Sequence, residues 1–162
     1  MIVVADTSPL NYLLLIDEVD VLPEIFGRVL IPRTVFQELQ HPKAAAKVRQ
    51  WVTNVPAWLE VRPSGLLANP SLIGLDVGER DAIQMALDLG VKIVLIDEAQ
   101  GRQEAEKLHL EVRGTLGILE RGSRLGMVDL QQALTKLDQT NFRLSPAVRA
   151  ALMKRNPLST QE

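Results

Sequence analysis

The chain of 162 residues contains no cysteine, only two histidines and few aromatic side chains, which make up 4% of the sequence. The lack of cysteine excludes disulfide bonds and thiolate metal sites, and two histidines alone argue against a zinc site. No segment approaches the ~20 consecutive apolar residues of a membrane-spanning helix, so no membrane partner is expected. The N-terminal residues include no basic cluster and reach an acid at Asp6. They do not resemble a signal peptide, and we expect a cytoplasmic protein.

The chain also lacks a surplus of positive charge, since its formal net charge is -2. Proteins that bind nucleic acid through phosphate contacts alone usually carry a basic surplus. Either nucleic acid is not the ligand, or bound cations supply some of the positive charge. The hydrophobic fraction of 46% is sufficient for a core, and the length is typical of one domain.

Short apolar runs alternate along the chain with segments of helical character. Two of these runs, Ile2–Ala5 and Lys92–Ile96, lead directly into the acids Asp6 and Asp97. Alternating strands and helices predict an α/β fold of three layers, in which helices cover both faces of a central parallel sheet. Ligands of such folds bind at the carboxyl ends of the strands. We therefore expect Asp6 and Asp97 at the same edge of the sheet.

The other elements follow from apolar periodicity, helix caps and turn residues. Asp76 is predicted to cap a helix that Gly90 ends. We expect a main domain over residues 1–125 and a helical extension of the same domain over residues 126–162. Further strands are predicted at 28–31, 59–62 and 111–113, with a loop at 63–74. Helices are predicted at 9–15, 19–26, from Pro32 onward, 42–53, 77–89, 98–108 and 115–125, with two more between 130 and 153.

Three further acids occupy positions that suit a shared site. Glu38 lies in an otherwise apolar helical context, and Glu79 and Asp81 lie near the start of a predicted helix. Glu79 shares a helix face with core residues, whereas Asp81 lies about 200° around the helix, so both border one site only near the helix start. Carboxylates that converge repel one another unless they are protonated or a cation lies among them. An all-oxygen site favours Mg²⁺ or Mn²⁺, which can activate water and stabilise charge on a phosphoryl oxygen.

Each acid also has a simpler explanation when it is taken alone. Asp6 and Asp97 each precede a predicted helix and are suited to capping it. Glu38 fits a solvated or ion-paired helix position. Glu79 and Asp81 fit the preference of the helix macrodipole for acids in the first turn. Together, however, these explanations do not account for two acids that end the two best core strands.

Five stretches of the chain resemble the PIN-domain superfamily, and more narrowly a PIN-like family of unknown function that is related to the VapC toxins. They cover most of the chain, from Ile2 to about Leu144. The stretches are VVADTSPLNYLLLID, IPRTVFQEL, LDVGERDAIQMAL, IVLIDEAQGRQEAEKLHLEVRGTLGIL and a tail with NFRLS. The resemblance implies a PIN-like fold with extra C-terminal helices, in which residues 1–125 form the nuclease domain.

The resemblance also implies site residues, an activity and partners. Asp6 matches the first acid of the family, Glu38 the helical glutamate and Asp97 the late acid. The GERDA segment is similar to the GE-x-E/D pattern of PIN and flap-nuclease sites, which points to Glu79 and Asp81. Members of the family cleave RNA with a divalent metal ion, here Mg²⁺ or Mn²⁺. Toxin members are held inactive by a small antitoxin protein, and PIN-like proteins commonly form homodimers.

Beside the acids, Thr7, Ser8 and Arg102 are candidate substrate contacts. Arg102 fits equally a phosphate contact, an orienting partner of the site carboxylates, or a surface ion pair on its own helix. Two other classes of protein remain as alternatives. One is a PIN-like binding module without catalysis. The other is a phosphotransfer domain, which needs a second acid two residues after Asp6, where this chain has Ser8.

Overall fold

The structure is a computed structural model, and it describes residues 1–65 and 67–157. Within these residues, five parallel strands form one sheet in the order β3-β2-β1-β4-β5. Helices connect successive strands, so the predicted parallel sheet with helical crossovers is confirmed. The strands are β1 (Ile2–Ala5), β2 (Arg28–Pro32), β3 (Leu59–Arg62), β4 (Ile93–Leu95) and β5 (Glu111–Arg113).

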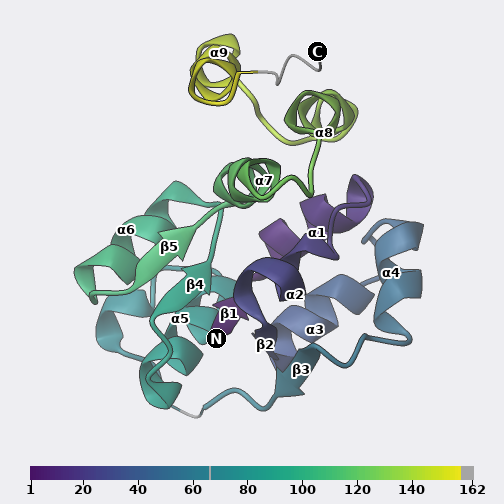
Figure 1. The fold of residues 1–162 in the computed structure, drawn as a ribbon. Coiled ribbons are helices and arrows are strands. Elements are labelled where there is room, and N and C mark those ends of the chain that lie inside the picture. The colour runs from purple at the N-terminus through teal and green to yellow at the C-terminus, as the bar shows by residue number, and fades with distance from the viewer. Residues whose placement is uncertain (66, 158–162) are drawn as a thin grey trace.

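Helices cover both faces of the sheet and give the predicted three-layer α/β/α fold (Figure 1). One face packs against α5 (Val77–Leu89) and α6 (Ala99–Lys107), and the other against α1 (Thr7–Leu15), α2 (Val21–Phe26) and α7 (Thr115–Arg124). Successive side chains of a strand point to opposite faces of the sheet. Along β1, Val4 therefore packs in the core on the side of α5 and α6, whereas Val3 and Ala5 pack in the core on the side of α1, α2 and α7. Among the described residues, no helix is both long enough and apolar enough to cross a membrane.

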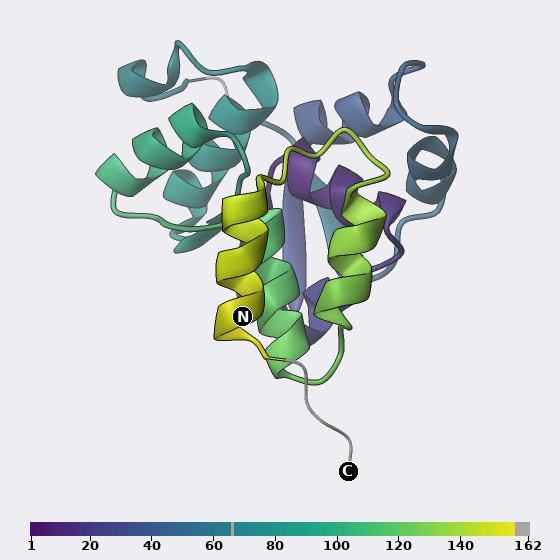
Figure 2. The ribbon, with the colours of Figure 1, turned by 90° about the horizontal axis from the view of Figure 1, so that it is seen from above.

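The C-terminal helices thicken one layer of this fold. α8 (Leu130–Leu137) and α9 (Pro146–Arg155) lie on α7, on the side away from the sheet (Figures 1 and 2). Leu134 and Leu152 belong to the same hydrophobic core as α1 and α7. The two helices therefore share a core with the main part of the chain. The predicted extension over residues 126–162 is described as far as Pro157, and residues 158–162 lie outside the described residues.

Some predicted boundaries differ from the observed ones. α1 begins at Thr7 rather than Pro9, because a proline is tolerated in the first turn, where its missing N–H has no intrahelical acceptor. α3 (Arg33–Gln40) is followed by a turn, so that α4 (Ala46–Val52) begins later than the alanine-rich composition predicted. The predicted loop at 63–74 contains a short 3₁₀ helix, η1 (Pro70–Leu72), and its residue 66 lies outside the described residues.

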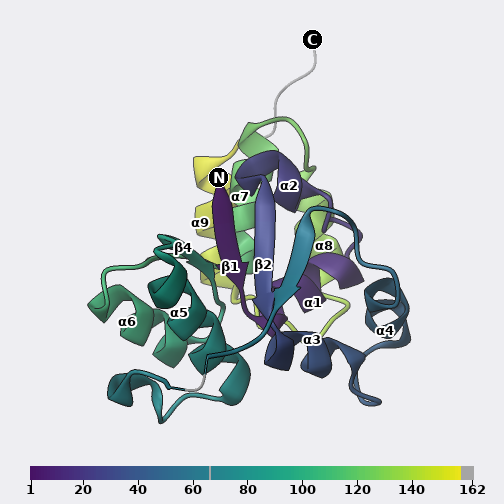
Figure 3. The same ribbon diagram turned by 90° about the horizontal axis from the view of Figure 1, so that it is seen from below.

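The order of the strands reverses between β1 and β4, which lie side by side in the middle of the sheet. Ala5 pairs with Leu95, and the backbone N–H of Asp6 donates to the carbonyl of Leu95 at 3.0 Å. Figure 3 shows the strands from below, with α1 and α3 beyond one end of β1 and β2. Ligands of open α/β sheets bind outside the carboxyl ends of the strands where the order reverses. The fold thus places Asp6 and Asp97 at the edge where a site is expected.

Candidate active site

Asp6 is the most buried acid of the predicted site, with 3% of its surface exposed. Asp6 occupies the N-cap position of α1, but its side chain accepts no capping hydrogen bond from that fully described helix, so the interpretation of its carboxylate as a helix cap is wrong. Among residues 1–65 and 67–157, Asp6 Oδ1 is buried and has no hydrogen-bond donor. Burial, together with the charges of Asp76, Glu79 and Glu38, raises the pKa of Asp6 from 3.8 to about 8.

Glu38 reaches the same place from α3. Its Oε2 accepts a hydrogen bond from the hydroxyl of Thr7, which links α3 to the start of α1. Gly78, at the start of α5, lies against both Glu38 and Asp6. A Cβ atom at Gly78 would lie 2.6 Å from Glu38 Oε1 and 3.0 Å from Asp6 Oδ1. The carboxylates of Glu38 and Asp6 therefore converge at a point that only a glycine leaves open. Burial, more than any neighbouring charge, raises the pKa of Glu38.

Glu79 joins this cluster from the first turn of α5. The turn is fixed by Asp76, whose Oδ1 accepts a hydrogen bond from the Glu79 backbone N–H at 2.9 Å, as predicted for a helix cap. Glu79 is only 4% exposed. Burial, and then the charges of Asp76 and Glu98, raise its pKa from 4.5 to about 7. A Cβ atom at Gly101 of α6 would lie 3.2 Å from Glu79 Oε2, so this carboxylate is packed between two helices.

Asp97 lies between β4 and α6 and has a different environment. Its Oδ1 accepts the backbone N–H of Thr115 at 2.7 Å, and its Oδ2 accepts the Thr115 hydroxyl at 2.8 Å. Asp97 thus ties the end of β4 to the start of α7. It does not cap α6, whose N-cap position is Glu98, so that interpretation is wrong too. Burial raises the pKa of Asp97, and the two Thr115 donors and the nearby Arg102 counteract this effect.

Asp81 is held apart from the cluster by its own partners. Its Oδ2 accepts the hydroxyl of Thr34 at 2.8 Å, and its Oδ1 lies 3.3 Å from Nε of Arg80. These contacts attach Asp81 to α3, in agreement with its position about 200° around the helix from Glu79. Asp81 makes only a minor contribution to the raised pKa of Glu38. Of the two acids in the GERDA segment, Glu79 is the one whose carboxylate lies among the other acids.

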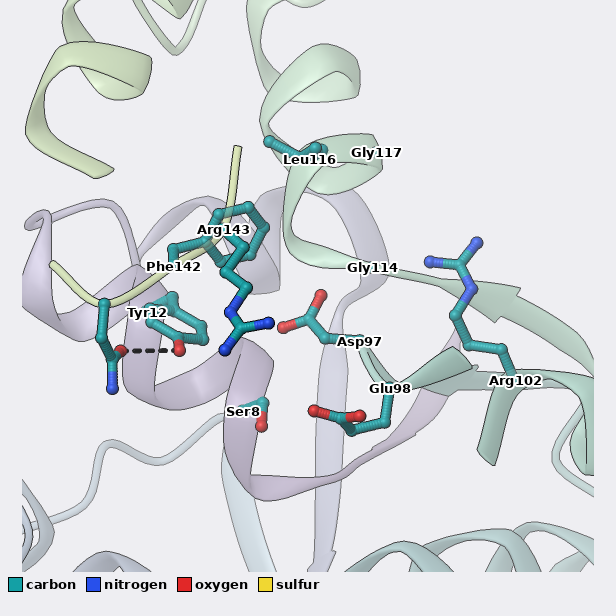
Figure 4. Close-up of a pocket in the computed structure, with 11 residues that line it drawn as sticks. Ser8, Tyr12, Asp97, Glu98, Arg102, Gly114, Leu116, Gly117, Phe142 and Arg143 are labelled. Carbon is teal, nitrogen blue, oxygen red and sulfur yellow. Dashed lines mark hydrogen bonds between the residues drawn. The ribbon is translucent and has the colours of Figure 1, made fainter. Parts of the chain in front are cut away.

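A cavity of about 340 Å³ opens beside Asp97. The predicted substrate contacts Ser8 and Arg102 line it, together with Arg143 (Figure 4). The third predicted contact, Thr7, lies instead against Glu38 through its hydroxyl. The acid cluster and the cavity therefore adjoin each other along one edge of the sheet, and Asp97 with Glu98 stands between them.

The acids fit a divalent cation, although in residues 1–65 and 67–157 no three of them already adopt metal-binding geometry. The raised pKa values of Asp6 and Glu79 mean that these carboxylates retain protons near neutral pH. A bound cation would replace those protons and remove the repulsion between the carboxylates. It would also supply a partner for the unpaired Oδ1 of Asp6. Oxygen-only ligands of this kind suit Mg²⁺ or Mn²⁺.

The prediction from sequence missed several participants. Asp76 was expected only as a cap and Glu98 only as a helix residue, yet the charges of both act on Glu79. Their positions gave a signal, since Asp76 precedes Glu79 by one helical turn and Glu98 directly follows Asp97. Nothing in the sequence shows that Gly78 makes room for two carboxylates from other elements. That role depends entirely on how the helices pack.

Comparison with known families agrees with this arrangement. The sequence profile of one family, described as a PIN domain, matches residues 2–156. No curated protein and no solved structure matches the chain. The matched range includes the sheet, the acids at its edge and both C-terminal helices. The chain therefore belongs to the PIN-domain family.

Proposed function

We propose that this protein is a ribonuclease that hydrolyses RNA phosphodiesters with Mg²⁺ or Mn²⁺. Membership of the PIN-domain family implies a nuclease in general terms. The observation that supports the metal-dependent form is the buried Oδ1 of Asp6, which has no donor among the described residues and converges with Glu38 beside Gly78. A buried carboxylate oxygen without a donor is destabilising in a purely structural role. It suits a position that is completed by a cation.

Each acid has a proposed role in this reaction. Asp6 and Asp97, at the ends of adjacent strands, would hold the main cation. Glu79 would bind it through water or hold a second ion, and we assign this role to Glu79 rather than to Asp81. Glu38, whose orientation the Thr7 hydroxyl fixes, orients the attacking water. The raised pKa of Glu38 improves its capacity to accept a proton.

The proposed reaction is the attack of water on an RNA phosphodiester. The oxygen of a water molecule attacks phosphorus, and its proton passes to Glu38. The bond from phosphorus to the leaving ribose oxygen breaks, and that oxygen is protonated from solvent. A divalent cation would supply charge stabilisation at the phosphoryl oxygens when bound. Arg102 and Ser8, on the cavity side of Asp97, contact the phosphate.

The substitution Asp6→Asn tests the proposal, because it removes one negative charge and leaves the shape nearly unchanged. We expect cleavage of single-stranded RNA with Mn²⁺ to fall at least about 10³-fold, as for loss of a group that acts directly on the reaction. The matched control is Asp20→Asn, an exposed acid at the N-cap of α2 that makes no side-chain capping bond with that fully described helix. It should cleave at the parental rate.

Two results would count against the proposal. Equal rates for Asp6→Asn and the parent would remove Asp6 from the reaction. A parent protein that binds no Mn²⁺ in calorimetry and cleaves no RNA would favour a PIN-like binding module instead.

The resemblance to VapC toxins extends the proposal to a cytoplasmic toxin that a small antitoxin protein inhibits, and to a homodimer. Exposed apolar side chains near the C-terminal helices, including Leu125, Met127 and Val148, support an assembly surface there. Light scattering of the purified chain tests the dimer. Loss of ribonuclease activity on co-expression with the product of a neighbouring short reading frame tests the antitoxin.

A further inference from the structure

We propose that the cavity beside Asp97 binds one unstacked nucleotide of single-stranded RNA, and that Arg143 is its phosphate contact. This inference rests on the proposed ribonuclease function. It assigns the segment between α8 and α9 to substrate binding, a role that the acid cluster alone does not provide.

The segment that carries Arg143 is anchored to α1. The hydroxyl of Tyr12 donates a hydrogen bond to Asn141 Oδ1 at 2.8 Å, shown as the dashed line in Figure 4. The ring of Phe142 packs against that of Tyr12 edge to face, with centroids 4.9 Å apart. Thr140 braces the turn, since its hydroxyl accepts the Phe142 backbone N–H at 3.1 Å. These contacts fix the backbone on both sides of Phe142, so Arg143 is presented to the cavity from a defined position.

Arg143 and Arg102 flank Asp97 from opposite sides of the cavity (Figure 4). In the part of the chain that the structure describes, neither guanidinium forms an ion pair with a carboxylate. Each oxygen of Asp97 already accepts a hydrogen bond from Thr115, so Asp97 does not need either arginine as a hydrogen-bond donor. Two guanidinium groups with free donors form a suitable site for a phosphate.

The remaining walls suit a base. Phe142 is half-buried, and with Leu116 it adds apolar side chains to the wall of the cavity. A volume of about 340 Å³ is near the lower limit of small-ligand sites, which suits a single nucleotide. Bases inside a duplex are stacked and cannot enter such a cavity, whereas single strands can present an unstacked base to aromatic and arginine side chains.

Binding of a short, fluorescein-labelled single-stranded RNA in EDTA tests the inference without any cleavage. Arg143→Ala should weaken binding about tenfold, the loss expected for one charge-assisted contact to phosphate. Arg143→Lys, which keeps the charge but not the two-pronged geometry, should recover part of the affinity. The matched control is Arg49→Ala, an exposed arginine of α4 that does not line the cavity, and it should bind as the parent does.

The outcomes separate this inference from the proposed function. If Arg143→Ala and Arg49→Ala bind the RNA equally, or if the parent binds none, the cavity is not a nucleotide site, even when the protein cleaves RNA with Mn²⁺. If binding depends on Arg143 but no metal-dependent cleavage occurs, the cavity assignment stands and the ribonuclease proposal fails. Duplex RNA of the same sequence should show no dependence on Arg143, and an equal dependence would contradict the unstacked nucleotide.

Discussion

Asp6 and Asp97 follow adjacent strands at one edge of the sheet, yet their carboxylates have opposite environments. Asp6 is almost fully buried, has an unpaired oxygen among the described residues, and lies among other acids. Asp97 is half-buried, with both oxygens bonded to Thr115 and Arg102 nearby. Two aspartates in equivalent topological positions therefore differ in their burial and in the hydrogen-bond donors available to their carboxylates.

This difference divides the site into two parts. On the side of Asp6, several acids converge, the pKa values of Asp6 and Glu79 are raised, and Asp6 Oδ1 has no donor among the described residues, which suits the proposed cation. On the side of Asp97, the carboxylate accepts two hydrogen bonds from Thr115, and the guanidiniums of Arg102 and Arg143 form no ion pair with the described residues. We therefore expect substitutions on the first side to affect chiefly metal binding. Those on the second side should affect structure and substrate binding as well, besides the cation contact proposed for Asp97.

The largest expected effect is on stability, and it has opposite signs at the two aspartates. At a pH below 3.8, the pKa of Asp6 in the unfolded chain, Asp6 is protonated in both the folded and the unfolded state. Its ionisation then costs the folded state no stability. Between 3.8 and about 8 only the unfolded state has lost the proton, so metal-free stability falls by up to about 1.4 kcal/mol per pH unit. Asp6→Asn removes this loss and should raise the melting temperature at pH 8.

The pKa of Asp97 is also raised by burial, but the two Thr115 donors and Arg102 oppose this effect, so the loss of its Thr115 bonds should dominate. Asp97→Asn weakens these two bonds and should lower stability by about 1 kcal/mol, or about 2–4 °C in melting temperature. Calorimetric melting of both variants in EDTA across the pH range measures the contrast. Mn²⁺ should stabilise the parent more at pH 8 than at pH 5, because protons compete with the ion at low pH. Shifts of the same sign in the two variants would abolish the distinction between the two environments.

A second test separates the two acids of α5. Glu79→Gln should reduce Mn²⁺-dependent RNA cleavage about 100-fold, since Glu79 is buried among the site acids. Asp81→Asn should change cleavage only a few-fold, because the asparagine oxygen can still accept the Thr34 hydroxyl. Cleavage rates at saturating RNA compare the two variants directly. A larger loss in Asp81→Asn would transfer the metal-binding role to Asp81.

A smaller effect is expected at Gly78, where no ligand is removed. In Gly78→Ala the new methyl group meets Glu38 Oε1 and Asp6 Oδ1, so the Glu38 carboxylate must move away. We expect Mn²⁺ affinity to fall about tenfold, or about 1.4 kcal/mol, by titration calorimetry. Gly117→Ala in α7 is the control, because a Cβ atom there has no neighbour within 4 Å among the described residues. Unchanged affinity in Gly78→Ala would mean that Glu38 does not take part in binding.

The sequence was sufficient for the architecture and for most of the acids at the site. Apolar runs that end in Asp6 and Asp97 predict strands of one parallel sheet with both acids at the same edge, because strands buried on both faces consist of continuous apolar residues. It was insufficient for choosing between Glu79 and Asp81, since that choice depends on whether Thr34 lies close enough to bond to Asp81. It also failed to foresee the position of Arg143, which depends on long-range packing of Phe142 against Tyr12.

The smallest effect concerns the anchoring of Asp97. Thr115 is fully buried, and Thr115→Val replaces its hydroxyl with a methyl group of similar size. Asp97 Oδ2 then loses its hydroxyl donor while Oδ1 keeps the backbone N–H. We expect a loss of about 1 kcal/mol in the free energy of unfolding by denaturant titration, with Thr115→Ser close to the parent. Because the acids around Asp6 are untouched, Mn²⁺ affinity should change less than in Gly78→Ala. A greater loss of Mn²⁺ affinity in Thr115→Val would show that the Thr115 hydroxyl orients Asp97 for the ion, and the two parts of the site would then act as one.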